Sequence, residues 1–249
     1  MIASLPSVAS CMLAALAGLL AGLARGFSGF GAALIFMPLS AAALGPRLAA
    51  PLLLVVDAAM TLPLILPAWR QADRHEVWSV AAGALVGAPL GTALLVHADP
   101  QALRWALSGL VLTMLALLAS GWRYSGRLGP RAAVSVGVVS GFCTGAAQMG
   151  GPPVVVAWLG GAIPVSRVRA NLLLFFAATG VISAISYAVG GLFNFGLVAL
   201  AVLVAPAYGL GVWIGTRLFG LASERAFRRA CFVLIALAAV IGLPLWDRP

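Results

Sequence analysis

The chain has 249 residues, of which 63% are hydrophobic and 8% are charged, whereas an average soluble domain is about 45–50% apolar and about 25% charged. This composition predicts a membrane protein with no room for a separate soluble domain. All fifteen basic residues are arginine, which excludes a phosphate-binding loop or Schiff-base chemistry built on lysine. The formal net charge of +9 lies in short gaps between apolar stretches, where cytoplasmic loops concentrate positive charge, so we expect no nucleic-acid binding.

Ten apolar stretches, bounded by Arg, Asp, Gly and Pro, follow one another along the chain and are predicted to be helices. The first half holds 7–24, 32–44, 49–68, 77–96 and 103–121, and the second half holds 132–144, 153–162, 168–190, 195–219 and 226–245. The stretches 32–44, 132–144 and 153–162 are too short to cross a hydrocarbon core about 30 Å thick. We therefore predict an all-α polytopic membrane protein in which each half has one short, broken or re-entrant helix hairpin and three full transmembrane helices.

The two halves are related in sequence, because ordered sets of residues recur at nearly one offset. Gly18, Gly22, Gly26 and Gly31 recur 119 residues later as Gly137, Gly141, Gly145 and Gly150, and Gly87, Gly91, Thr92 and Arg104 recur 124 residues later as Gly211, Gly215, Thr216 and Arg228. Such a duplication is frequent in transporters. We therefore predict one transmembrane domain, 1–249, made of a first repeat, 1–122, and a second repeat, 123–249.

The arginines between the helices predict how the two repeats lie in the membrane. If each hairpin returns to its own side, eleven arginines fall on one face and three on the other; if each hairpin is a single interrupted span, the division is six against eight. The gap after the third segment carries Arg70 and Arg74 in the first half, but only GGLFNF in the second. Because cytoplasmic loops are enriched in arginine, we predict inverted repeats with an Arg-rich cytoplasmic linker and both termini periplasmic.

Each repeat contains a glycine-rich break, within 22–38 and within 141–153. Small residues at every fourth position allow close helix packing, and this is the preferred interpretation of the outer glycines, Gly18, Gly22, Gly137 and Gly141. The denser glycines that follow predict unwound backbone, which survives at membrane depth only where protein or a water-filled cavity satisfies its polar groups. Helices that begin near Gly31 and Gly151 would aim free N–H groups at the breaks, which favours an anion site. The candidate backbone ligands are Gly29, Gly31, Gly150 and Gly151.

Arg25 lies beside the first break and is the strongest single candidate for binding an anion. An arginine at membrane depth is costly unless it faces a cavity or a partner, and its planar guanidinium fits the oxygens of sulfonate, sulfite or carboxylate. The alternative is an arginine at a hairpin tip that reaches the cytoplasmic interface. Ser28, Thr144 and Gln148 are candidates for neutral hydrogen bonds to the same anion, or for bonds to neighbouring backbone. Asn171 is a weaker polar candidate for the site.

Asp57 is the only acidic residue well inside an apolar stretch. That position favours a proton carrier coupled to transport or an ion-pair partner of Arg25, with a structural, cavity-facing role as the alternative. Its counterpart in the second repeat lies near Phe176, so the two halves are not chemically equivalent. The three cysteines are far apart, and no metal-ligand spacing such as HExxH occurs. We therefore predict neither a metal site nor a cofactor.

Two other classes of function stay open. In the first, the protein is an anion channel or a membrane scaffold subunit, and its glycines serve packing alone. In the second, the string GFSG at 26–29 resembles the nucleophile motif of rhomboid intramembrane serine proteases. Such an enzyme also needs a histidine deep in a later helix, whereas His75 lies in a charged gap and His97 at the end of a span. We therefore predict that the protein is not an enzyme.

The residues around both breaks resemble the sulfite exporter TauE/SafE family, also called the toluene sulfonate uptake permease family. The resemblance rests on GFSGFGAALIFMP and GAAQMGGPP, on RLAAPLLLVVDAAMTLP, on the GxxxGT segments and on the short basic linker between the halves, and it covers essentially the whole chain. Family members are multi-pass carriers of the bacterial inner membrane for small anions. The resemblance implies a lipid-embedded secondary transporter for an anion such as sulfite, a sulfonate or sulfoacetate; a homodimer is left open.

Overall fold

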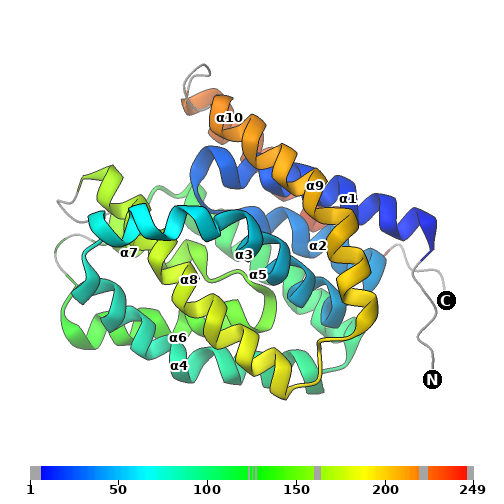
Figure 1. Ribbon diagram of the computed structural model, residues 1–249, viewed down its shortest axis with the longest axis horizontal. Coiled ribbons are helices and arrows are strands. Elements are labelled where there is room, and N and C mark those ends of the chain that lie inside the picture. The colour runs from blue at the N-terminus through cyan, green and yellow to red at the C-terminus, as the bar shows by residue number, and fades with distance from the viewer. Residues whose placement is uncertain are drawn as a thin grey trace.

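The computed structural model describes residues 7–122, 124, 126, 128–159, 164–218 and 224–245, with all their side chains except those of 159, 165 and 224–228. All regular secondary structure in these ranges is helical (Figure 1). In chain order the helices are α1 (Val8–Ser28), α2 (Ala32–Leu44), α3 (Pro46–Gln71), α4 (Arg74–His97), α5 (Pro100–Ala119), α6 (Pro130–Ala147), α7 (Gly151–Leu159), α8 (Val165–Val189), α9 (Phe195–Leu218) and α10 (Glu224–Ile241). Each predicted stretch coincides for most of its length with one of these helices, and the all-α prediction is confirmed; positions 160–162 and 219 of the predicted stretches lie outside the described residues.

Six helices in the described part of the chain, α1, α3, α4, α5, α8 and α9, are long and apolar enough to cross a membrane. The short second segment of the first half, α2, has 13 residues and the bounds that the sequence predicts. The first segment of the second half, α6, is longer than the predicted stretch 132–144: Pro130 occupies its first turn and it continues to Ala147. The chain is therefore a multi-pass membrane protein in which full-length helices alternate with short ones.

Charged residues at the helix ends satisfy backbone groups that the helices leave unpaired. The carboxylate of Asp73 accepts a hydrogen bond from an N–H group in the first turn of α4, and Asp99 accepts two from the first turn of α5. The guanidinium of Arg47 donates to the carbonyl oxygens of Leu95, at 3.2 Å, and Ala98, at 3.1 Å, where α4 ends. These contacts fix where α4 and α5 begin and where α4 stops.

Two glycine seams bring helix backbones into direct contact. In the first seam, between α1 and α9, a Cβ atom at Gly22 would clash with the carbonyl oxygen of Tyr208, and one at Gly211 with that of Leu19. The second seam, between α4 and α6, is built in the same way from Gly83, Gly87 and Gly91 on α4 and Gly137, Gly141 and Gly145 on α6. Packing is therefore the role of the fourfold-spaced glycines, as predicted for the outer ones, and it extends to Gly26 and Gly145 as well.

The pairing of the helices is reciprocal between the two halves of the chain. The first helix of each half lies along the fourth helix of the other, α1 on α9 and α6 on α4, and the third helices, α3 and α8, contact each other. Figure 1 shows α4 and α6 at one edge of the molecule and α1 with α9 at the opposite edge. This exchange is the pattern that a duplicated membrane protein with a pseudo-twofold axis would have; the opposite orientation of the repeats in the membrane stays a prediction.

Candidate functional site

The first break, between α1 and α2, depends on two glycines in the left-handed region. Gly29 has φ 79° and donates its N–H to the carbonyl oxygen of Arg25 at 2.8 Å, which ends α1; Gly31 has φ 91° and precedes α2. Other residues adopt this region at a cost, so glycine is needed at both positions. The hydroxyl of Ser28 donates to the carbonyl oxygens of Ala24 and Phe30, at 2.7 and 2.6 Å. Ser28 therefore stabilises the break itself.

The second break, between α6 and α7, is built differently. Gln148 has φ 57° and is the one non-glycine residue with positive φ in the described part of the chain. Its side-chain amide donates to the hydroxyl of Tyr187 at 3.1 Å. Gly150 packs on α6, where its carbonyl oxygen accepts a hydrogen bond from Ser140 and where a Cβ atom would clash with Thr144. A strained backbone at a residue that carries a long polar side chain is typical of functional sites.

A cavity of about 70 Å³ lies where the two breaks meet α3 and α8. A cavity that binds a single benzene ring has about 150 Å³, so this space suits a smaller ligand. The described residues that line it are Arg25, Gly31, Ala32, Ala33, Leu34, Leu53, Leu54, Asp57, Ala58, Thr61, Thr144, Gln148, Met149, Gly151, Pro152, Phe176, Thr179 and Gly180. Residues that are far apart in sequence, from both halves of the chain, therefore share one small chamber.

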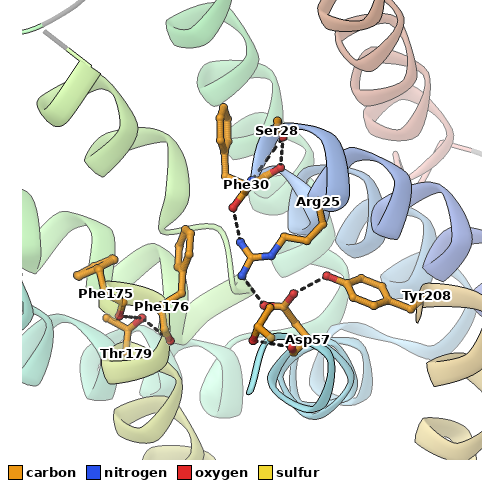
Figure 2. A network of polar contacts seen from close by, with 10 residues as sticks. Arg25, Ser28, Phe30, Asp57, Phe175, Phe176, Thr179 and Tyr208 are labelled. Atoms are coloured by element: carbon orange, nitrogen blue, oxygen red, sulfur yellow. Dashed lines mark hydrogen bonds and ion pairs between the residues drawn. The ribbon is translucent and has the colours of Figure 1, made fainter. Parts of the chain in front are cut away.

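Arg25 and Asp57 are the two charged residues among those that line this cavity (Figure 2). The Nη2 atom of Arg25 donates to Oδ2 of Asp57 at 3.0 Å, and its Nη1 atom donates to the carbonyl oxygen of Gly29 at 2.7 Å. The side chain of Arg25 is 7% exposed and that of Asp57 is 25% exposed. The ion pair that the sequence predicts is present, and it leaves the cavity walls with no net charge.

Two aromatic residues that sequence analysis did not select complete the surroundings of this ion pair. The ring of Phe176 lies under the guanidinium of Arg25, with 4.8 Å between Cζ and the ring centroid, which is a cation–π contact. The hydroxyl of Tyr208, a fully buried residue of α9, donates to Oδ1 of Asp57. The offset between the repeats locates Phe176 as the counterpart of Asp57, but no signal in the sequence distinguishes Tyr208 from other buried aromatic residues.

The two short helices contribute unequally to the cavity. Gly31, Ala32 and Ala33, at the start of α2, are among the residues that line the cavity, and this end of a helix carries partial positive charge. The corresponding turn of α7 contains Pro152 and Pro153, which have no N–H group to donate. In that turn of α7, Gly151 and Val154 are the residues that keep an N–H group, so α7 has fewer N–H groups to offer an anion than α2; that the two helices aim N–H groups at an anion stays a prediction.

The structure brings most, but not all, of the predicted site residues together. Arg25, Gly31, Asp57, Thr144, Gln148 and Gly151 line the cavity. Ser28, Gly29 and Gly150 are not among its lining residues and instead stabilise the two breaks through the contacts described above. Asn171 is buried elsewhere: its side-chain oxygen accepts a hydrogen bond of 2.7 Å from the backbone N–H of Asp73, which ties α8 to the turn between α3 and α4.

The surroundings of Ser28 also bear on the protease alternative. Its hydroxyl is engaged with two backbone carbonyl oxygens of the break. The two histidines lie in the first and last turns of α4, in a different part of the fold from this break. A serine nucleophile needs an adjacent base to accept its proton, so this arrangement gives the GFSG string a structural explanation.

Comparison with known proteins bears on the family of the chain. The family model described as "Sulfite exporter TauE/SafE" matches residues 14–241. No curated protein and no solved structure matches the chain. The matched segment runs from α1 to the end of α10 and includes both breaks and the whole cavity lining. The chain belongs to the sulfite exporter TauE/SafE family of membrane transporters.

Proposed function

We propose that this protein is a secondary transporter for a small oxyanion, such as sulfite or a short sulfonate, and that it binds the anion in the cavity between the two breaks. The observation that carries the proposal is the guanidinium of Arg25, which is 7% exposed and faces this cavity beside the amino-terminal end of α2. A buried arginine at a helix N-terminus presents planar donors and partial positive charge to the same point. Sulfite and sulfonates carry three oxygens that accept such donors.

The size of the cavity favours the smaller members of this substrate class. A volume of about 70 Å³ favours sulfite or methanesulfonate over an aromatic sulfonate, because a cavity that binds a single benzene ring has about 150 Å³. Thr144 and Gln148 also line the cavity and would contact the remaining oxygens. Thr144 is the repeat counterpart of Arg25, so related positions in the two halves would approach one anion from two sides.

Asp57 is the residue that would couple transport to protons. The charged or titratable side chains that contact its carboxylate are Arg25 on α1 and Tyr208 on α9, while α8 contributes the neutral residues Phe176 and Thr179 to the same cavity. An anion that binds Arg25 adds negative charge beside this carboxylate in a site of low dielectric constant. Uptake of one proton by Asp57 would remove that repulsion, and one proton would then travel with each anion.

The glycine seams define which parts would move during transport. Backbone contact locks α1 to α9 and α4 to α6, so these two pairs would move as units, each combining helices of both halves. The two breaks lie at the ends of α1 and α6, one on each unit. Movement of one unit against the other would expose the cavity first to one side and then to the other, which is alternating access around a fixed site.

A thermal-shift screen of the purified, full-length protein tests this proposal. The screen compares sulfite, methanesulfonate, benzenesulfonate and acetate, with chloride as the background anion. A ligand that binds the folded state raises the melting temperature, by an amount that grows with the logarithm of the ligand concentration divided by Kd. We expect a concentration-dependent rise with sulfite or methanesulfonate that is larger than the rise with benzenesulfonate. The absence of any anion-dependent shift would contradict the proposed binding site.

A further inference from the structure

The carboxylate of Asp57 is held by one donor on each of its oxygens. Arg25 donates to Oδ2 at 3.0 Å and Tyr208 donates to Oδ1. Figure 2 shows the two donors reaching Asp57 from opposite sides, Arg25 from the first half of the chain and Tyr208 from the second. Hydrogen bonds to a charged group are among the stronger ones in proteins. The position of this carboxylate is therefore determined by both contacts and not by the ion pair alone.

The two donors are fixed relative to each other by the seam between α1 and α9. Gly22, three residues before Arg25, approaches so closely that a Cβ atom there would clash with the backbone of Tyr208, and Gly26 contacts Val212 in the same way. Arg25 and Tyr208 thus project from one rigid helix pair. Asp57 comes from a different helix, α3, which packs against α8 and α9. The α1–α9 pair therefore forms a two-point clasp around a side chain of α3.

The same guanidinium that we assign to substrate already binds a carboxylate. Carboxylate and sulfonate oxygens compete for the same donors of arginine with the same geometry. Nη1 commits one N–H to Gly29 and Nη2 commits one N–H to Asp57, so an anion that needs the Nη2 side of the guanidinium competes there with Asp57. Asp57 is a tethered competitor for the site, and the strength of its attachment reduces the apparent affinity for any anion.

We propose that Tyr208 is a positioning residue that sets anion affinity by holding Asp57 in this competing position; the inference rests on the proposed function. Because the clasp holds Tyr208 next to Arg25, the hydroxyl of Tyr208 contacts Asp57 while the Asp57 carboxylate is bound to Arg25. This hydrogen bond breaks when α3 moves away from the clasp. The return of Asp57 to the clasp expels the anion. Tyr208 therefore weakens binding and speeds release without contacting the substrate.

The Tyr208→Phe variant tests this role, because it removes only the hydroxyl. We expect the dissociation constant for sulfite, measured by isothermal titration calorimetry on the full-length protein at one fixed pH, to fall about three- to tenfold. In proteoliposomes KM and kcat should fall together, because release becomes slower. The Asp57→Asn variant should bind sulfite at least as tightly as Tyr208→Phe does. Unchanged or weaker binding by a folded Tyr208→Phe protein would overturn the inference.

The double variant Tyr208→Phe with Asp57→Asn distinguishes positioning from general support of the fold. If Tyr208 acts through Asp57, its substitution has no further effect on affinity once Asp57 is neutral. A merely structural role would instead give the same change in both backgrounds. Ser108→Ala is the control: Ser108 is a buried hydroxyl residue of α5, a helix with no residue among the described residues that line the cavity, and the loss of its hydroxyl should not tighten binding.

The outcomes also separate this inference from the proposed function. If sulfite binds the wild-type protein and loses binding in Arg25→Gln, but Tyr208→Phe leaves the affinity unchanged, the anion site stands and the clasp is wrong. If sulfite binds both Asp57→Asn and Tyr208→Phe but is undetectable with the wild type, the clasp is supported in its strongest form. If neither sulfite nor methanesulfonate binds the wild type or either variant, the anion site and the clasp are both wrong.

Discussion

At the scale of single residues, the site depends on a balance between one buried cation and one buried carboxylate. Arg25 has three kinds of contact, with Asp57, with the carbonyl oxygen of Gly29 and with the ring of Phe176. Removing one member of a partly buried ion pair leaves the other unpaired at a large cost in stability, whereas neutralising both restores the balance. Variants at Arg25 are therefore best studied together with a neutral residue at position 57.

The proton-coupling role of Asp57 predicts the pH dependence of the Asp57→Asn variant. Methanesulfonate is the suitable substrate, because it stays singly charged between about pH 5 and pH 8. Wild-type protein in proteoliposomes should accumulate it in response to an imposed proton gradient, whereas Asp57→Asn should only equilibrate it, at a rate that changes little with pH. Equal gradient-driven accumulation by wild type and variant would show that protons are not coupled through this residue.

Individual site residues differ in how well the sequence identifies them. Arg25 and Asp57 are predictable because an ionised side chain inside an apolar stretch needs a functional or structural reason. Gly31 and Gly151 follow from the break pattern. The roles of Phe176 and Tyr208 are not predictable from the sequence, since an aromatic residue in a membrane helix can pack equally well against lipid or against the protein core. Their roles depend on the contacts of α8 and α9 with the ion pair, which local sequence does not encode.

At the scale of secondary-structure elements, the seams determine which helices are rigidly joined. Both seams place backbone against backbone with no space for a methyl group, and each joins a helix of one half to a helix of the other. The helix positions follow from the apolar stretches, and most ends lie within a few residues of the prediction. Prolines in the first turn of α3, α5 and α6 extend these helices beyond the apolar residues, because proline is favoured there.

Two Gly→Ala substitutions, one inside the α4–α6 seam and one outside it, should have different effects on the free energy of unfolding. At Gly87 a Cβ atom would clash with the carbonyl oxygen of Val138, while Gly109, in the helix α5, has open space around it. Gly87→Ala should lower the free energy of unfolding by about 1–3 kcal/mol through overpacking. Gly109→Ala should leave it unchanged or raise it by up to about 1 kcal/mol. Thermal unfolding in detergent measures both, and equal melting temperatures would contradict close packing at this seam.

At the scale of the whole molecule, the reciprocal pairing of helices is what creates one cavity from two sequence-distant breaks. The glycine recurrences predict that the halves are related. Local periodicity does not specify that the first helix of each half packs against the fourth helix of the other half. That pairing depends on contacts between residues that are far apart in the sequence. It places Arg25 and Thr144, at equivalent positions in the two halves, on the walls of the same chamber.

If the repeats are inverted in the membrane, as the arginine distribution predicts, two equivalent turns should be accessible from opposite sides. Gln71, at the end of α3, and Phe193, after α8, are both exposed. In a protein whose native cysteines are replaced, Phe193→Cys should react with a membrane-impermeant maleimide in intact cells. Gln71→Cys should react only after the inner membrane is permeabilised, because arginines mark that side as cytoplasmic. Labelling of both positions from one side would contradict inverted repeats.

Arg25 is the residue that we propose to bind the transported anion, and saturable exchange of radiolabelled sulfite or methanesulfonate in proteoliposomes is the experiment that tests this role. The comparison uses wild type, Arg25→Gln and the charge-balanced Arg25→Gln with Asp57→Asn, each shown to be folded by its melting temperature. We expect saturable exchange by the wild type and none by either variant, because no guanidinium remains to bind the anion. If the folded double variant exchanges the anion at the same rate as the wild type, Arg25 does not bind the transported anion.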